Sequence, residues 1–102
     1  MAEFTYRARV AQEVAISDTA VPITDAAFNW LDGELDSAKI ATISAATADI
    51  RFLYTGDDPS ATFGYVLPKD SILEIPRNEN VNNLIFIRSS AVDAVLTITL
   101  EW

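Results

Sequence analysis

The stretch ADIRFLYTGDDPSATFGYVLP, residues 48–68, decides the fold class of this sequence. Residues 49–55 alternate in the period-two pattern of a strand, and Arg51 lies on the face opposite Ile50. The letters GDDPS then interrupt the pattern with residue types that favour turns, and a second apolar run follows. Two alternating runs joined by such a turn predict a β-hairpin. The side chains expected on its core face are Ile50, Phe52 and Tyr54.

Similar alternation recurs along the chain and predicts seven to nine short strands with no long helix. Residues 84–88 (LIFIR) are apolar on both faces, which is typical of a strand in the centre of a sheet. Residues 95–102 place Leu96, Ile98, Leu100 and Trp102 on one face. The other expected strands are residues 4–16, 21–23, 39–46, 63–67 and 71–75, and residues 4–16 form either one long strand or two strands joined at a bend near Gln12.

Residues 24–33 (TDAAFNWLDG) fit two local structures equally well. Thr24 or Asp25 could cap a short helical turn that Gly33 ends, and an irregular loop is the alternative. Residues 32–36 and 78–80 are expected to be polar turns. The sequence therefore predicts one all-β domain over residues 1–102, an antiparallel two-sheet β-sandwich with at most one short helical turn. The strand order of a jelly roll is one order that such a sandwich could have.

The composition excludes most enzyme chemistry. The 102 residues contain no cysteine and no histidine, so a Ser-His-Asp triad, a histidine base and the usual zinc ligand sets are unavailable to the chain. Half of the residues are hydrophobic, which is enough for a core. A domain this small is marginally stable and commonly gains stability from a disulfide, a metal or a partner subunit. Self-association is therefore the expected source of additional stability.

The charge balance restricts the possible partners. Seven basic residues against fifteen acidic ones give a formal net charge of −8, which argues against binding to nucleic acid or to an anionic membrane. Glu3, Arg7 and Arg9 lie where a signal peptide would need an apolar core. No apolar run is long enough for a membrane span. We therefore expect a protein that is made and assembled inside a cell.

Two groups of acidic residues are candidate sites. Asp57 and Asp58, with Asp49 and Asp70 in the neighbourhood, could supply oxygen ligands to calcium, but aspartate and proline are also common turn residues and a simple turn is favoured. Glu74 and Glu101 lie on strands, with nothing in the sequence to bring them together as a catalytic pair. We therefore expect no catalytic residue, no metal, no cofactor and no enzymatic activity.

Arg51 and Arg88 each lie beside apolar strand residues. A surface salt bridge is the simplest expectation for each of them, with Asp49 or Glu74 as a carboxylate partner. The alternative is that an arginine faces a partner subunit, because arginine is enriched at interfaces.

Aromatic residues are the better candidates for contacts with a partner. Phe4 and Tyr6 begin an apolar stripe with Arg7 and Arg9 on its opposite face, and residues 1–12 could form an extended arm or a swapped strand. Trp102 is the last residue of a regular strand, where so large an apolar side chain is expected to pack against another surface. Ordinary closing strands are the alternative for both segments. The expected interface residues are Phe4, Tyr6, Arg7, Arg9 and Trp102.

Residues 38–102 resemble small virion structural proteins of tailed phages. The shared features are a strand with an Ile-Arg run (Ile50, Arg51), a Pro-containing acidic turn, a Gly-aromatic-x-Leu step at residues 64–67, a buried strand ending in Ile87-Arg88 and a closing strand of alternating β-branched residues. The order Gly56-Asp57 departs from the Asp-Gly order of those proteins.

The resemblance implies a head decoration (cement) protein, a small β-rich module that is often a homotrimer. Such a protein would be synthesised in the host cytoplasm and bind the major capsid protein on the outer capsid surface of the virion. The alternative is a tail, neck or baseplate accessory module that binds a carbohydrate or a receptor. That function would use exposed aromatic residues such as Tyr54, Tyr65 or Trp30 as a platform.

Overall fold

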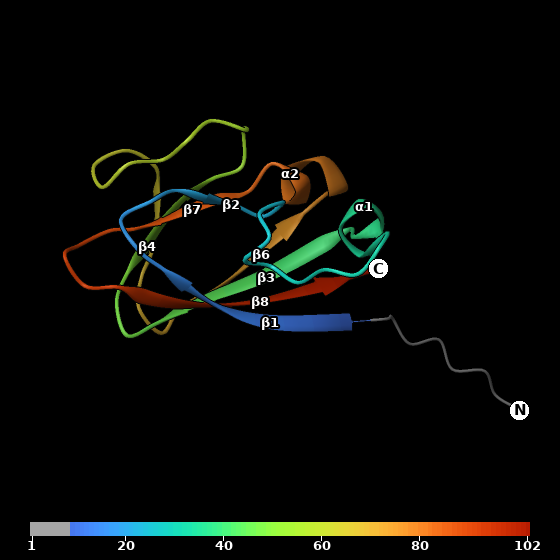
Figure 1. Ribbon diagram of the computed structural model, residues 1–102, viewed down its shortest axis with the longest axis horizontal. Helices are drawn as coiled ribbons and strands as arrows, with labels where there is room; N and C mark the ends of the chain where they lie inside the picture. The colour runs from blue at the N-terminus through green and yellow to red at the C-terminus, as the bar shows by residue number, and fades with distance from the viewer. Residues whose placement is uncertain (1–8) are drawn as a thin grey trace, which may run out of the picture.

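The structure, a computed structural model, describes residues 9–102, which form eight strands and two short helices (Figure 1). The strands are β1 (Arg9–Ile16), β2 (Val21–Pro22), β3 (Ile40–Ala46), β4 (Ile50–Leu53), β5 (Tyr65–Leu67), β6 (Ile72–Pro76), β7 (Ile85–Arg88) and β8 (Ala94–Glu101). The helices are α1 (Glu34–Ser37) and α2 (Asn78–Asn82). Residues 9–12 of the expected arm lie in β1, and residues 1–8 lie outside the described part of the chain.

The strands form two antiparallel four-stranded sheets, which confirms the predicted β-sandwich. One sheet has the order β1-β8-β3-β6 and will be called sheet A, and the other has the order β2-β7-β4-β5 and will be called sheet B. Every connection between consecutive strands crosses from one sheet to the other, except the one between β4 and β5, and the two sheet orders are those of a jelly roll. The predicted hairpin is present, because β4 pairs with β5 and Ile50 lies opposite Leu67.

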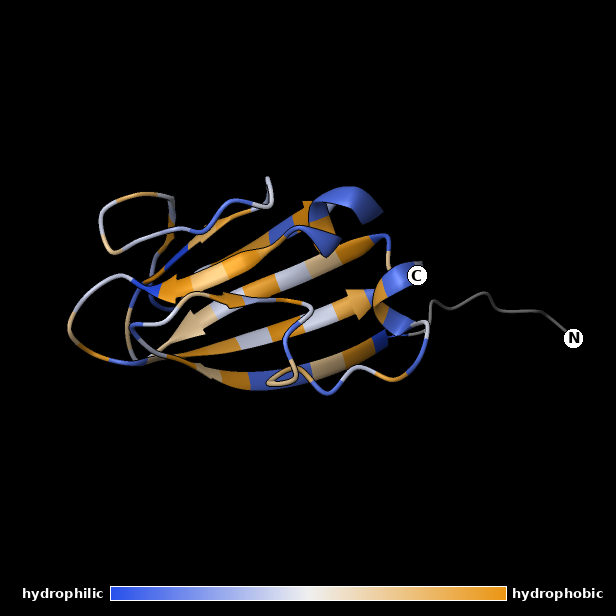
Figure 2. Cartoon of the chain, turned by 45° about the horizontal axis from the view of Figure 1, so that its top comes forward, coloured by the Kyte–Doolittle hydropathy of each residue, from blue (hydrophilic) through white to orange (hydrophobic). Residues whose placement is uncertain are grey.

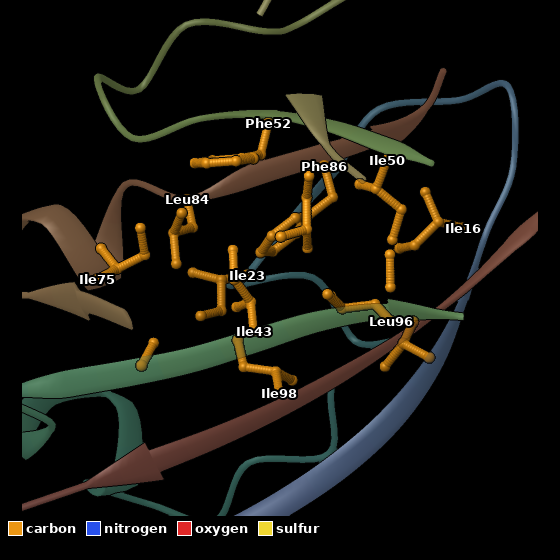
Figure 3. Packing of buried hydrophobic residues seen from close by; sticks show 14 of the residues in the cluster. Ile16, Ile23, Ile43, Ile50, Phe52, Ile75, Leu84, Phe86, Leu96 and Ile98 are labelled. Atoms are coloured by element: carbon orange, nitrogen blue, oxygen red, sulfur yellow. The ribbon is translucent and has the colours of Figure 1, made fainter. Parts of the chain in front are cut away.

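The core fills the space between the sheets, as Figure 3 shows. Phe86 and Ile50 point from sheet B toward Ile43, Leu96 and Ile98 of sheet A. All five side chains are fully buried or nearly so. Removing a side chain of this size from water stabilises a fold by about 1.5–3 kcal/mol, so this layer carries most of the stability.

β8 holds sheet A together. It pairs with β1 over eight residues and with β3 over seven, while the alternate side chains Leu96, Ile98 and Leu100 are fully buried. Figure 2 shows the resulting alternation of hydrophobic and hydrophilic positions along the strands. β7 lies between β2 and β4, as its apolar faces predict, and Ile85, Phe86 and Ile87 are buried.

The helices correct the sequence-based expectation of at most one helical turn. Residues 24–33 form turns and bends without a helix, and α1 begins only after Gly33, within the polar turn expected at residues 32–36. α2 replaces the polar loop expected at residues 78–80. The reason lies in the contacts between the two helices: Asn78 Nδ2 donates to the carbonyl oxygens of Asp36 and Ala38, and Asn82 Nδ2 donates to that of Leu35. These asparagines satisfy the free carbonyls at the end of α1, which a single-segment pattern cannot reveal.

The core predicts a large difference between two truncations. Phe86→Ala should lower the free energy of unfolding by about 3–5 kcal/mol, because it leaves a cavity at the centre of the sandwich. Leu31→Ala is the control, since Leu31 is 72% exposed and the same kind of truncation should cost less than about 0.5 kcal/mol. Urea unfolding followed by circular dichroism measures both. Equal losses would contradict this assignment of the core.

Candidate functional site

The sandwich is open along the edge formed by β5 and β6. Tyr65 lies opposite Phe52 and Leu73 lies opposite Ile43, and both of these partners are buried in the core. Since facing residues of paired strands share a side of the sheet, Tyr65 and Leu73 belong to the inner faces. Tyr65 is nevertheless 54% exposed and Leu73 41% exposed. The inner face of the sandwich is therefore incomplete at this edge.

A groove of about 520 Å³ runs along the open edge. Strands of both sheets line it, so it continues the space between the layers rather than hollowing the surface of one sheet. Its lining is Phe52, Tyr54, Tyr65, Val66, Leu73, Glu74, Ile75, Pro76 and Asn80. A mostly apolar groove with a few polar groups is the usual form of a binding site.

The tyrosines form the aromatic wall of the groove. Their rings stack with centroids 5.7 Å apart and an interplanar angle of 14°, and Phe52 packs at a tilt against Tyr65 with centroids 5.8 Å apart. A hydrogen bond with the Tyr65 hydroxyl, reinforced by repulsion between the two charged forms, raises the pKa of Tyr54 above its ordinary value. The raised pKa keeps the Tyr54 hydroxyl protonated at neutral pH, where it is a polar group of the groove.

The rim at the end of β6 is held in a strained turn. Arg77 follows Pro76 with φ 78° and ψ 128°, a conformation that residues with a side chain rarely adopt. Its carbonyl oxygen accepts the backbone N–H of Asn80 at 3.1 Å, and Asn80 Nδ2 donates to the Pro76 carbonyl at 3.1 Å. These bonds fix Asn80 beside the groove and leave its amide oxygen without a hydrogen bond among the described residues.

The residues predicted as an interface fall into two groups. Phe4, Tyr6 and Arg7 lie outside the described residues. Arg9 begins β1, where its exposed guanidinium donates from Nε to Glu101 Oε2 at 2.8 Å. Trp102 is half-buried and packs against the core at the end of β8. Neither Arg9 nor Trp102 lines the groove at the β5–β6 edge.

Trp30 is separate from the two tyrosines of the expected platform. Its ring stacks on Phe28 with centroids 5.9 Å apart, and its Nε1–H donates to the Ile23 carbonyl oxygen at 3.1 Å. Trp30 therefore packs against the core next to β2. Of the three aromatic residues of the expected platform, the structure brings together Tyr54 and Tyr65.

Neither strand arginine pairs with Asp49 or Glu74. Arg88 pairs with Asp93, and Arg51 donates from Nη1 to the Gly64 carbonyl oxygen at 2.8 Å. Gly64 has φ +131°, and a Cβ there would lie 3.2 Å from the Phe52 carbonyl oxygen. Only glycine therefore lets the chain pass this close to β4 and present its carbonyl to Arg51.

The acidic loop adopts turn contacts. Asp57 accepts a hydrogen bond from the Thr55 hydroxyl, while Asp49 accepts the backbone N–H of Lys69 at 2.8 Å. Within residues 9–102, no group of three or more histidine, cysteine or acidic side chains is arranged to hold a metal ion. None of the helices formed by these residues is long and apolar enough to cross a membrane.

Comparison with known proteins gives no relative: no protein-family model, curated protein or solved structure matches the chain significantly.

The sequence could have indicated part of the groove, because Ile72 and Leu73 are adjacent apolar residues that cannot both face a core. The exposure of Tyr65 depends on what the other sheet places against it, which alternation within one strand does not report.

The tyrosine pair predicts a perturbed titration. Tyr65→Phe removes the hydroxyl that raises the pKa of Tyr54, so Tyr54 should ionise at a lower pH in the variant than in the unchanged protein. Because the folded-state pKa is raised, the stability linked to this group is lost as the pH rises through that value. Phenolate absorbance during a pH titration measures the change, with Tyr54→Phe identifying the signal. An unchanged Tyr54 titration would contradict the hydrogen bond.

Proposed function

We propose that this chain is a non-enzymatic structural protein of a tailed-phage virion that decorates and stabilises the outer capsid as a cement protein. The proposal is supported by the resemblance of residues 38–102 to small virion proteins. It is also supported by the jelly-roll strand order, which occurs among viral capsid domains and also among lectins.

The observation that carries the proposal is the exposed apolar surface around the β5–β6 edge. Large apolar side chains are exposed on both strands and in the loop before β5, although the protein carries a net charge of −8. A concentration of apolar surface on an otherwise acidic protein marks a contact with another macromolecule. The residues are Phe63, Tyr65, Val66, Ile72 and Leu73.

The mechanism is the addition of buried surface at many equivalent positions. The major capsid protein is the partner, and a homo-oligomer, with a trimer favoured, is the unit that binds. Each contact needs only modest affinity, because the linked subunits of an oligomer bind a repeating lattice at high effective concentration. The virion's outer surface is the location that this mechanism requires.

Copy number in the virion is the direct test. Quantitative mass spectrometry of purified particles should find this chain in hundreds of copies, commensurate with the major capsid protein. A few to a few dozen copies would overturn the capsid assignment and favour the tail, neck or baseplate. Absence from the particles would overturn the virion proposal altogether.

A carbohydrate- or receptor-binding accessory module is the second candidate, favoured by the stacked tyrosines. One face of a sugar ring is apolar enough to lie on the exposed ring of Tyr65, while the Tyr54 hydroxyl and the Asn80 amide are polar groups of the same groove.

This second function predicts saturable binding on a glycan array that Tyr65→Ala abolishes and Val92→Ala leaves unchanged. Val92 is the control because it is exposed to a similar degree as Tyr65 and does not line the groove. Binding that survives Tyr65→Ala would place the glycan elsewhere, and an array without any bound glycan would count against this candidate.

A further inference from the structure

We propose that the groove at the β5–β6 edge accepts residues 4–8 of a second copy of this chain as an added strand beside β6. The inference rests on the proposed homo-oligomer and specifies its contact. Such strand addition is a known mode of recognition, in which backbone hydrogen bonds supply affinity and side-chain pockets supply specificity.

β6 offers the edge that an added strand requires. Among the described strands it pairs only with β3, so its other side has a row of backbone groups available for hydrogen bonds. Its side chains alternate between Leu73 and Ile75 on the inner face and Ile72 and Glu74 on the outer face. A strand beside it would cover the exposed part of Leu73 and complete the inner face.

Residues 4–8 (FTYRA) carry the matching pattern. Phe4, Tyr6 and Ala8 fall on one side of an extended segment and Thr5 and Arg7 on the other. With the apolar side in the groove, Arg7 comes to the outer face of sheet A, which is also the face of Glu74. Among the described residues, none forms a hydrogen bond or ion pair with the Glu74 side chain that would compete with Arg7.

Charge favours residues 4–8 over the β6 strand of a second copy as the strand that pairs with this edge. Residues 4–8 carry one positive charge and no negative charge, whereas residues 10–102 carry five basic and fourteen acidic side chains. Antiparallel pairing of two β6 strands centred on Glu74 would place two carboxylates opposite each other, which is destabilising. Pairing with residues 4–8 instead places a guanidinium near the carboxylate.

The segment must come from another copy, because its own β1 lies at the wrong edge. β1 and β6 are the two outer strands of sheet A, so a strand added beyond β6 lies four strand spacings, about 19 Å, from β1. The five residues from Phe4 to Arg9 span at most about 18 Å when extended, and Tyr6 reaches only about 11 Å. Donor and acceptor edges therefore belong to different copies. Such a head-to-tail contact forms a ring, for example a trimer, when the rotation between successive copies closes.

Site-directed cross-linking tests the contact, since the chain has no cysteine of its own. Full-length Tyr6→Cys protein is mixed with full-length Leu73→Cys protein under mild oxidation, and peptide mapping identifies the bond. The expected product is a disulfide between positions 6 and 73 of different chains. Ile72→Cys is the matched control, because Ile72 is adjacent and even more exposed (73%) but lies on the opposite face of β6. It should cross-link to Tyr6→Cys at least about tenfold more slowly, because two cysteines on opposite faces do not meet the distance that a disulfide requires.

A charge exchange tests the register without cysteines. Arg7→Glu and Glu74→Arg should each weaken self-association by up to about fivefold, the scale of an exposed ion pair, and the double variant should restore it. Analytical ultracentrifugation measures the association constants, with circular dichroism confirming that each variant is folded.

The proposal is overturned if the unchanged protein is a monomer, if positions 72 and 73 cross-link to position 6 equally well, or if the double variant is not restored. A bond between positions 6 and 73 of the same chain would also overturn it. These outcomes are independent of the proposed virion role: a monomer found in hundreds of copies per particle would reject the strand exchange and keep the capsid function. An oligomer that shows the strand exchange but is absent from the particles would keep the strand exchange and reject the capsid function.

Discussion

The pairing of β8 with strands on both sides is the constraint on which the rest of the sandwich depends. β1 and β3 are distant in sequence and are joined in sheet A only through β8. The same strand buries Leu96, Ile98 and Leu100, and the first two face the inner side chains of sheet B in Figure 3. Because backbone pairing and core packing coincide in one strand, loss of its register would expose its entire apolar set.

The unequal lengths of β5 and β6 explain why the sandwich is open at one edge. β5 has three residues and β6 has five, so the inner face of β6 extends past the strand that should cover it. The opposite edge differs, because β1 contacts β7 and the half-buried Trp30 and Val21 pack against the core near β2. A partner that binds through apolar contacts therefore finds exposed inner-face side chains beside Tyr65 and Leu73.

Alternation predicted the fold class and most strands because burial of one sheet face imposes it directly on the sequence. Ile50, Phe52, Leu96 and Ile98 are buried as the pattern indicates. Features that depend on contacts between distant segments were predicted wrongly or missed. The helix α2 depends on Asn78 and Asn82 meeting α1 across the fold, and Tyr54 lies at the groove beyond the end of β4 instead of inside the core.

The central position of β8 has a consequence for synthesis of the protein. β8 comes last among the described strands, yet it occupies an inner position of sheet A. While the chain is being translated, β1 has no neighbour in its own sheet and β3 has only β6. The half-built sheet therefore exposes two strand edges and the apolar face that β8 later buries, and these invite association between nascent chains. Residues 94–101 must therefore be present before sheet A can be completed, and their pairing removes both open edges and covers the apolar face.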